Sequence, residues 1–303
     1  MRITQSMMSS SMMRGLQANY SRMNKYQEQA LTERRINRPS DDAVGIASAL
    51  RYRGELGMTE QFEQNVEDAD SWMKFNDTMM SEAVKILHTV SEKAVQGTTE
   101  SINPEARKIL SKEIDELYKQ LVAIGNSQFK GKYIFNGQMT DQKPFSDDPA
   151  NTAFTLDDGK MRYQIGAGIY AEVNSLGKDV FGAYQDPADP TKTTNVFKAL
   201  DNLKKALNND STADIEKGIT EIQTSMDRII YAQADVGARQ NRLAFTASRL
   251  EDLNLNYVDL QSKVEDINVP TTITELKTAE GIYQLSLDTM ARIIRPSLMD
   301  FLR

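Results

Sequence analysis

Side chains that commonly catalyse reactions or bind metals are scarce in this sequence. Cys is absent and His88 is the only histidine. We therefore expect neither a catalytic triad nor an ordinary zinc site. His88 follows Leu87, an apolar position in a helical repeat, which favours a solvated flank residue over a general base. We therefore predict that the chain is not an enzyme and has neither a cofactor nor a metal site.

Two short motifs resemble ligand-binding loops only superficially. Asp157-Asp158-Gly159 lacks the alternating acidic ligands and the closing Glu of a calcium loop, and a hairpin turn explains it better. Gly166-Ala167-Gly168 lacks the third glycine and the strand–helix setting of a dinucleotide site. We predict that this second motif is a loop.

A joint between two helices is predicted near the N-terminus. Pro39 disfavours helical backbone at Arg38, so a helix arriving from the N-terminal side should end there. Ser40 can cap a second helix, with Asp41 and Asp42 in its first turn against the positive end of the helix dipole. This pattern alone indicates an ordinary helix–helix joint.

Cationic side chains cluster just before this joint, and a second proline lies near the other end of the chain. The cations could attract phosphate, but the two adjacent aspartates favour ion pairing within or between subunits. The candidate joint residues are Arg34, Arg35, Asn37, Arg38, Pro39, Ser40, Asp41, Asp42 and Pro270.

Long helices must position this joint. From Phe62 to Ala94, apolar residues are spaced alternately by four and three, and only the polar Asn76 interrupts this heptad seam. A second such seam runs from Leu243 to Ile267. Between them, Asn103 and Pro104 are a capping residue and a first-position proline. These patterns predict an antiparallel helical bundle or coiled coil.

The helical period stops between residues 132 and 192, where we predict a small β-rich insertion. The segment 132–135 suggests a strand followed by a tight turn at Asn136-Gly137. The segments 154–156 and 161–165 suggest a hairpin around Asp157–Gly159, and 169–173 suggests a further strand.

Narrow apolar stripes mark both ends of the chain. A stripe of this width needs a partner helix to be buried. The stripe residues are Ile3, Met8, Met12, Leu16, Tyr20 and Met23 at one end, and Ile273, Leu276, Tyr283, Leu287, Met290, Ile294, Leu298 and Phe301 at the other.

The predicted organisation is close to symmetric about the insertion. Residues 1–40 and 268–303 form a terminal helix pair, 41–131 and 193–267 form a long rod, and 132–192 form the insertion. We predict a mainly α, elongated molecule with both chain ends at one end. The net charge of −7 argues against nucleic-acid binding, and no segment is apolar enough to cross a membrane or act as a Sec signal.

Three stretches together resemble the flagellin family, which includes flagellins and their hook-associated relatives. They are the run 37–42, the run Val236–Leu243 and the run Ser262–Asp266, and the likeness covers roughly residues 1–130 and 195–303. Ala43 and Asn268-Val269-Pro270 depart from the family pattern. The rod motif residues are Gly237, Arg239, Asn241, Arg242 and Leu243.

Two further features favour the junction members of this family over filament flagellins. They are the run Gly131–Gly137 leading to Lys143-Pro144-Phe145, and the ending 297–303. The resemblance implies an extracellular structural protein, exported without a cleaved signal peptide, that joins the hook to the filament. A flagellin, or a soluble coiled-coil adaptor, is the alternative.

The resemblance also implies partners and a mechanism. The partners are hook-associated protein 1, flagellin, identical subunits in a ring, and the flagellar export chaperone and apparatus. The terminal helices would be poorly ordered in the free monomer and would pair on assembly. The narrow stripes agree, because such a helix buries too little apolar surface to offset its ordering entropy alone.

Overall fold

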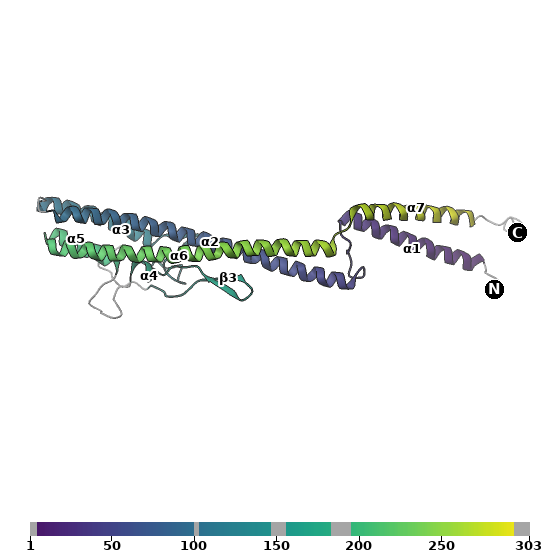
Figure 1. The fold of residues 1–303 in the computed structure, drawn as a ribbon, viewed down its shortest axis with the longest axis horizontal. Helices are drawn as coiled ribbons and strands as arrows, with labels where there is room; N and C mark the ends of the chain where they lie inside the picture. The colour runs from purple at the N-terminus through teal and green to yellow at the C-terminus, as the bar shows by residue number, and fades with distance from the viewer. Residues whose placement is uncertain (1–4, 100–102, 147–155, 183–194, 294–303) are drawn as a thin grey trace. The chain divides into compact units, whose positions relative to one another are not determined.

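The structure is a computed structural model that describes residues 5–99, 103–146, 156–182 and 195–293. In this described part the chain forms helices and a few short strands (Figure 1). The helices are α1 (Gln5–Thr32), α2 (Ala43–Thr98), α3 (Pro104–Gly125), α4 (Gly177–Phe181), α5 (Val196–Asn208), α6 (Thr212–Glu265) and α7 (Val269–Ile293). The prediction of a mainly α fold with a small β insertion is confirmed.

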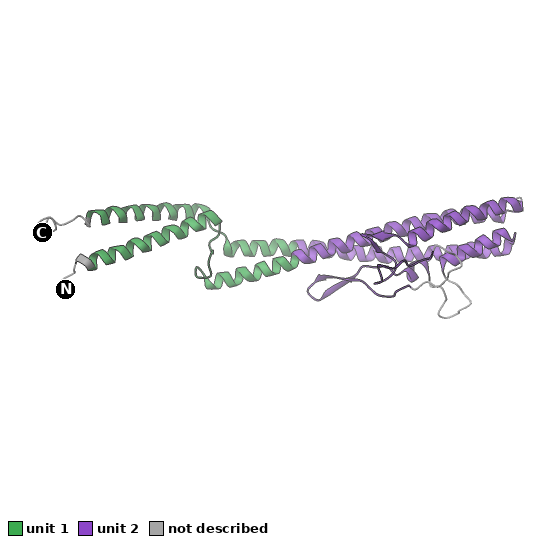
Figure 2. Cartoon of the chain, turned by 180° about the vertical axis from the view of Figure 1, so that it is seen from behind, with its two compact units in different colours: residues 1–59, 252–303 green, residues 60–251 purple. Residues whose placement is uncertain are grey.

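The chain forms two compact units (Figure 2). Unit 1 comprises residues 1–59 and 252–303, and unit 2 comprises residues 60–251. The helices α2 and α6 each contribute residues to both units.

The core of unit 2 follows the predicted heptad seams. Met73, Met80 and Leu87 of α2 are fully buried, as are Ile222 and Ile229 of α6. Side chains of α3 and α5 belong to the same core cluster. Because α3, α4, α5 and α6 all contribute to this cluster, the apolar stripe of α2 is covered along its length in this unit.

The third helix begins and ends where the sequence predicts. The side chain of Asn103 accepts a hydrogen bond from the Ala106 backbone N–H at 2.8 Å, and Pro104 opens the helix. At the other end, the N–H of Asn126 is bonded to the carbonyl of Val122 at 3.0 Å. Local capping chemistry therefore sets both ends of α3.

The tight turn predicted at Asn136-Gly137 is present, because the Asn136 carbonyl accepts a hydrogen bond from the Met139 N–H at 3.0 Å and Gly137 has a φ of 56°. Strands β1 (Gln128–Phe129) and β2 (Lys132–Tyr133) pair antiparallel, so an additional hairpin turn that was not predicted, Lys130-Gly131, joins them. Both turn residues have positive φ, at 50° and 77°. Such a pair matches the right-handed twist of the flanking strands, which explains why the hairpin closes there.

The second hairpin also differs from the prediction. Strand β3 (Arg162–Gly166) pairs with β4 (Ile169–Glu172), and its turn contains Gly168 with φ of 72°. The predicted hairpin around Asp157–Gly159 is therefore wrong. Asp157 instead accepts a hydrogen bond from the Gln138 N–H at 2.6 Å. Of the predicted loop Gly166-Ala167-Gly168, the last two residues form the β3–β4 turn, whereas Gly166 ends strand β3. Residues 154–155 lie outside the described part.

In unit 1, α1 and α7 lie side by side (Figure 1). The rings of Tyr20 and Tyr283 have centroids 5.7 Å apart. The side chain of Asn19 donates a hydrogen bond to Ser286 Oγ at 2.8 Å. Residues far apart in sequence therefore form this helix pair.

Candidate assembly joint

The first helix ends earlier than predicted. Helix α1 stops at Thr32, six positions before Arg38. Glu33 has a φ of 57°, a left-handed conformation that ends a right-handed helix. The side chain of Gln29 then donates a hydrogen bond to the carbonyl of Arg35 at 2.7 Å. Pro39 therefore lies within a connector that is already non-helical.

The cap of α2 is Asp42 and not Ser40. Asp42 Oδ1 accepts hydrogen bonds from the N–H groups of Val44 at 3.2 Å and Gly45 at 2.8 Å. The helix begins at Ala43, so the residue directly before it has the capping position. Ser40 is exposed. A Cβ at Gly45 would lie 2.5 Å from an Asp42 oxygen, so glycine allows this close approach.

Asp41 stabilises the connector itself. Its Oδ2 accepts hydrogen bonds from the backbone N–H groups of Arg38 at 3.0 Å and Asn37 at 3.3 Å. Partial burial raises the pKa of Asp41, but these bonds and Lys25 outweigh it and hold the pKa below the ordinary value. The hydrogen bond from Gly45 lowers the pKa of Asp42, and Arg35 adds to this effect. Both carboxylates are therefore acceptors in their charged form.

The two connectors pair with each other through their backbones. The N–H of Arg35 donates to the carbonyl of Glu265 at 2.6 Å, and that of Ile267 donates to the carbonyl of Glu33 at 3.2 Å. Arg34 and Asp266 form an antiparallel β-bridge. The segments after α1 and after α6 thus form a short two-stranded ladder.

Glu265 is a buried charge of this joint that could not be singled out from its sequence position. The residue is 1% exposed. Its Oε2 lies 2.6 Å from Arg53 Nη2 and 3.8 Å from Arg34 Nε, and accepts a hydrogen bond from Gln261 at 3.2 Å. Burial raises the pKa of Glu265, but the hydrogen bond from Arg53 and the other partners lower it below the ordinary value.

The predicted pairing of the basic cluster with Asp41 and Asp42 holds for one arginine. Arg35 Nη1 is 3.2 Å from Asp42. Arg38 pairs with Glu28 at 3.1 Å, and Arg34 with Glu265. The side chains of Arg34 and Arg38 therefore pair with glutamates and not with the two aspartates.

Pro270 lies inside α7 and does not end α6. Helix α7 begins at Val269, and Asn268 Oδ1 accepts a hydrogen bond from the Thr271 N–H at 3.2 Å. A proline in the first turn costs no helical hydrogen bond. The break between the two helices therefore falls at residues 266–268, one turn earlier than the proline suggested.

The terminal stripes are only partly covered by the pairing of α1 with α7. Met290 is buried. Met12, Leu16, Met23, Leu276 and Tyr283 are half-buried, whereas Met8, Tyr20, Ile273 and Leu287 are exposed. The predicted stripe residues Ile3, Ile294, Leu298 and Phe301 lie outside the described residues.

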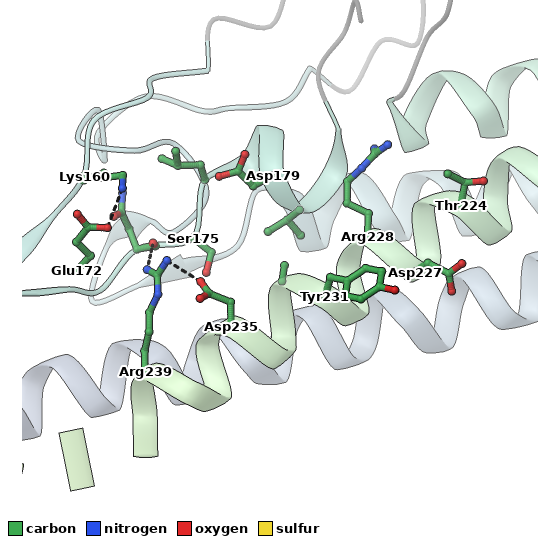
Figure 3. A pocket seen from close by; sticks show the side chains of 14 residues that line it. Lys160, Glu172, Ser175, Asp179, Thr224, Asp227, Arg228, Tyr231, Asp235 and Arg239 are labelled. Carbon is green, nitrogen blue, oxygen red and sulfur yellow. Dashed lines mark hydrogen bonds and ion pairs between the residues drawn. The ribbon is translucent and has the colours of Figure 1, made fainter. Parts of the chain in front are cut away.

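The rod motif holds the β insertion against α6 in unit 2. Arg242 donates a hydrogen bond to the carbonyl of Tyr170 at 3.0 Å. Arg239 pairs with Asp235 at 2.6 Å and reaches the carbonyl of Asn174 at 3.5 Å (Figure 3). Leu243 is buried in the core. Gly237 and Asn241 make no such contact in the described structure.

Comparison with known proteins gives consistent results. Residues 3–140 match the family model described as the bacterial flagellin N-terminal helical region. Flagellar hook-associated protein 3 of Escherichia coli is 24% identical over 94% of this chain and 95% of its own length. The flagellin of Bacillus subtilis is 26% identical, with 96% of each covered.

A solved structure is also similar. The flagellar junction protein FlgL from Legionella pneumophila is 18% identical, with a TM-score of 0.59 over 74% of this chain and 100% of that one. The chain is thus similar to hook-associated protein 3 and to flagellin over nearly its whole length, and to the flagellin N-terminal helical region over residues 3–140.

The run Gly131–Gly137, which favoured the junction members over filament flagellins, contributes buried side chains to the core of the insertion. Ile134 and Phe135 are fully buried. The Phe135 ring packs edge-on against Phe181, with centroids 5.0 Å apart. Phe145 lies 5.2 Å from Phe181, so the run and the following Lys-Pro-Phe meet in one aromatic cluster.

Clusters of potential metal ligands and membrane-spanning helices are both absent from the described residues. Among them, no group of three His, Cys, Asp or Glu side chains is placed to hold a metal ion. No helix in the described ranges combines the length and apolarity needed to span a membrane.

Proposed function

We propose that this chain is a structural, non-enzymatic subunit of the bacterial flagellum that joins the hook to the filament. The observation that carries this proposal is the near full-length likeness to hook-associated protein 3, over 94% of this chain and 95% of the relative. The likeness to the whole of a flagellar junction protein supports it.

The proposed partners follow from that position. The chain would contact hook-associated protein 1 on one side and flagellin on the other, and identical subunits would form a ring. It would reach the site through the flagellar export apparatus, escorted by an export chaperone and without cleavage of a signal peptide.

The proposed mechanism is coupled folding and assembly. Residues 1–40 and 268–303 would form an inner layer, and the rod and insertion would form the outer one. The exposed stripe residues Ile273 and Leu287 support this, because neighbouring subunits can cover them. The paired connectors at Arg35 and Glu265 would hold the terminal helices in one register during assembly.

Deletion of the gene in its native strain tests the function. We expect hooks to persist and flagellin to appear unpolymerised in the medium, and a plasmid copy of the wild-type gene should restore filaments. Intact filaments in the deletion strain would contradict the proposal.

The second candidate is a filament flagellin, which the similarity to the Bacillus subtilis protein favours. The same deletion separates the two candidates. Loss of a sole filament subunit leaves no flagellin to leak, whereas loss of the junction subunit releases it. Immunoblotting of the medium for flagellin distinguishes these outcomes.

A further inference from the structure

A groove between α2 and α6 in unit 2 has no role in the joint. Its volume is about 460 Å³. Buried Val66 and Leu243 form an apolar floor. Glu63 and Glu67 of α2 lie along one wall beside Asp70 and Lys74, which neutralise each other in an ion pair of 2.6 Å, so the wall carries a net negative charge. Within the described structure, neither glutamate has a hydrogen bond or ion pair. An apolar floor beside a wall of negative charge fits an apolar side chain with an adjacent cation.

The same unit exposes such a pair on another side of α6. Phe245 is 79% exposed. It follows the buried Leu243 by two residues, which places it about 200° around the helix. Arg249 lies one turn further on the same side, is exposed, and has no ion pair among the described residues. The phenyl ring of Phe245 is therefore an apolar surface exposed to solvent, which a partner could bury.

We propose that Phe245 of one copy enters the groove of a second copy, with its Arg249 against Glu63 and Glu67. This inference rests on the proposed junction function, in which identical subunits lie side by side. Aromatic and arginine side chains dominate the binding free energy of many interfaces. One cation facing two carboxylates also supplies charge complementarity.

The positions of groove and side chain favour contact between copies. Ala244 lines the groove and Phe245 is the next residue, so both features lie at one level of α6 but on different sides. A single chain cannot bring them together, because both lie on one helix. A head-to-tail contact of this kind repeats from copy to copy, and it forms a ring when the rotation closes.

Photo-crosslinking of the full-length chain in flagellated cells tests this contact. We would place p-benzoylphenylalanine at position 245 and, as a matched control, at Tyr231, which is 77% exposed on the same helix. We expect a product of twice 34.1 kDa from position 245 only, with the crosslink in the peptide between Arg53 and Lys74. A crosslink to flagellin, a crosslink elsewhere in the chain, or none would overturn the inference.

Charge exchange provides a second test that separates this inference from the proposed function. Glu67→Arg and Arg249→Glu should each raise the flagellin released into the medium toward the level of the deletion strain, and the double variant should restore retention. Both positions are exposed, so circular dichroism of the purified variants should match that of the wild type. If both single variants retain flagellin while the deletion strain releases it, this contact is wrong and the junction function stands. If the deletion strain itself retains flagellin, the proposed function fails.

Discussion

The two units use similar apolar spacing but bury it to different extents. In unit 2, Met80 and Leu87 are 0% exposed. In the terminal pair of unit 1, Ile273 is 47% and Leu287 is 42% exposed. The difference arises because five helices and the β insertion contribute to the core of unit 2, whereas α1 and α7 pack on each other.

This difference shows that a heptad-like pattern alone does not determine how stable a helix pair is. Ordering a helix costs about 1–2 kcal/mol of backbone entropy per residue, and burial must offset it. Unit 2 has enough buried surface for this within one chain. The pair of α1 and α7 leaves much of its stripe exposed.

The largest expected contrast comes from truncating one apolar side chain in each region. Met80→Ala should lower the free energy of unfolding by about 2–5 kcal/mol, because it opens a cavity in a closed core. Leu287→Ala should have a much smaller effect, since its side chain is largely solvated already. Urea unfolding of the full-length variants measures both, and equal losses would contradict the comparison.

Glu265 offers a pH-dependent test of the joint in unit 1. Its pKa is lowered in the folded chain, so the carboxylate stabilises the joint above its ordinary pKa of 4.5. This stabilisation is lost as the pH falls through the folded pKa. Glu265→Gln should weaken the joint at neutral pH, by less than the about 3–5 kcal/mol of a fully buried pair, because Arg34 and Arg53 are partly exposed.

The readout is proteolytic cleavage within residues 33–42, compared at pH 7 and pH 4. Wild type should become more sensitive at pH 4, and the variant should be sensitive at both values. Asp259→Ala, which removes an exposed ion pair with Lys263 on the same helix, is the control. Equal sensitivity of Asp259→Ala and Glu265→Gln would argue against a special role of Glu265.

Asn76 tests how far the core of unit 2 is optimised for stability. It is fully buried, and neither polar atom of its side chain has a hydrogen-bond partner among the described residues. Removing an unpaired buried amide should recover about 1–3 kcal/mol, so Asn76→Leu should raise the urea midpoint. A lower midpoint would mean that the amide is satisfied in solution.

The smallest expected effect distinguishes the two candidate caps of α2. Asp42→Ala should increase hydrogen exchange at Val44 and Gly45, because their N–H groups lose their acceptor. Ser40→Ala should leave these amides unchanged, since Ser40 accepts from neither. The reverse result would restore Ser40 as the cap.

Local chemistry made much of the fold predictable. Asn103 and Pro104 start α3 where expected, and the apolar spacing from Phe62 to Ala94 forms the buried side of α2. The prediction placed the cap of α2 at the wrong residue. Ser40, Asp41 and Asp42 are consecutive, and the side chain of each can accept a hydrogen bond from a helix N-terminus. Only the three-dimensional path of the connector decides between them.

The joint itself could be located only in part. Its N-terminal half contains proline and cationic residues that mark it in the sequence. Glu265 could not be recognised, because its partner Arg53 lies 212 positions away and an acidic residue near a helix end is usually solvated. Similarly, the turn at Lys130-Gly131 was missed because it lacks the Asn-Gly pair that marks the turn at Asn136-Gly137.

Hydrogen exchange of the full-length chain, free and assembled in native junctions, tests the central claim most directly. We expect amides of α1 and α7 to exchange far faster than those of α2 between residues 66 and 94 in the free chain, and to become protected on assembly. Equal protection of both regions in the free chain would contradict the claim that the terminal pair depends on assembly.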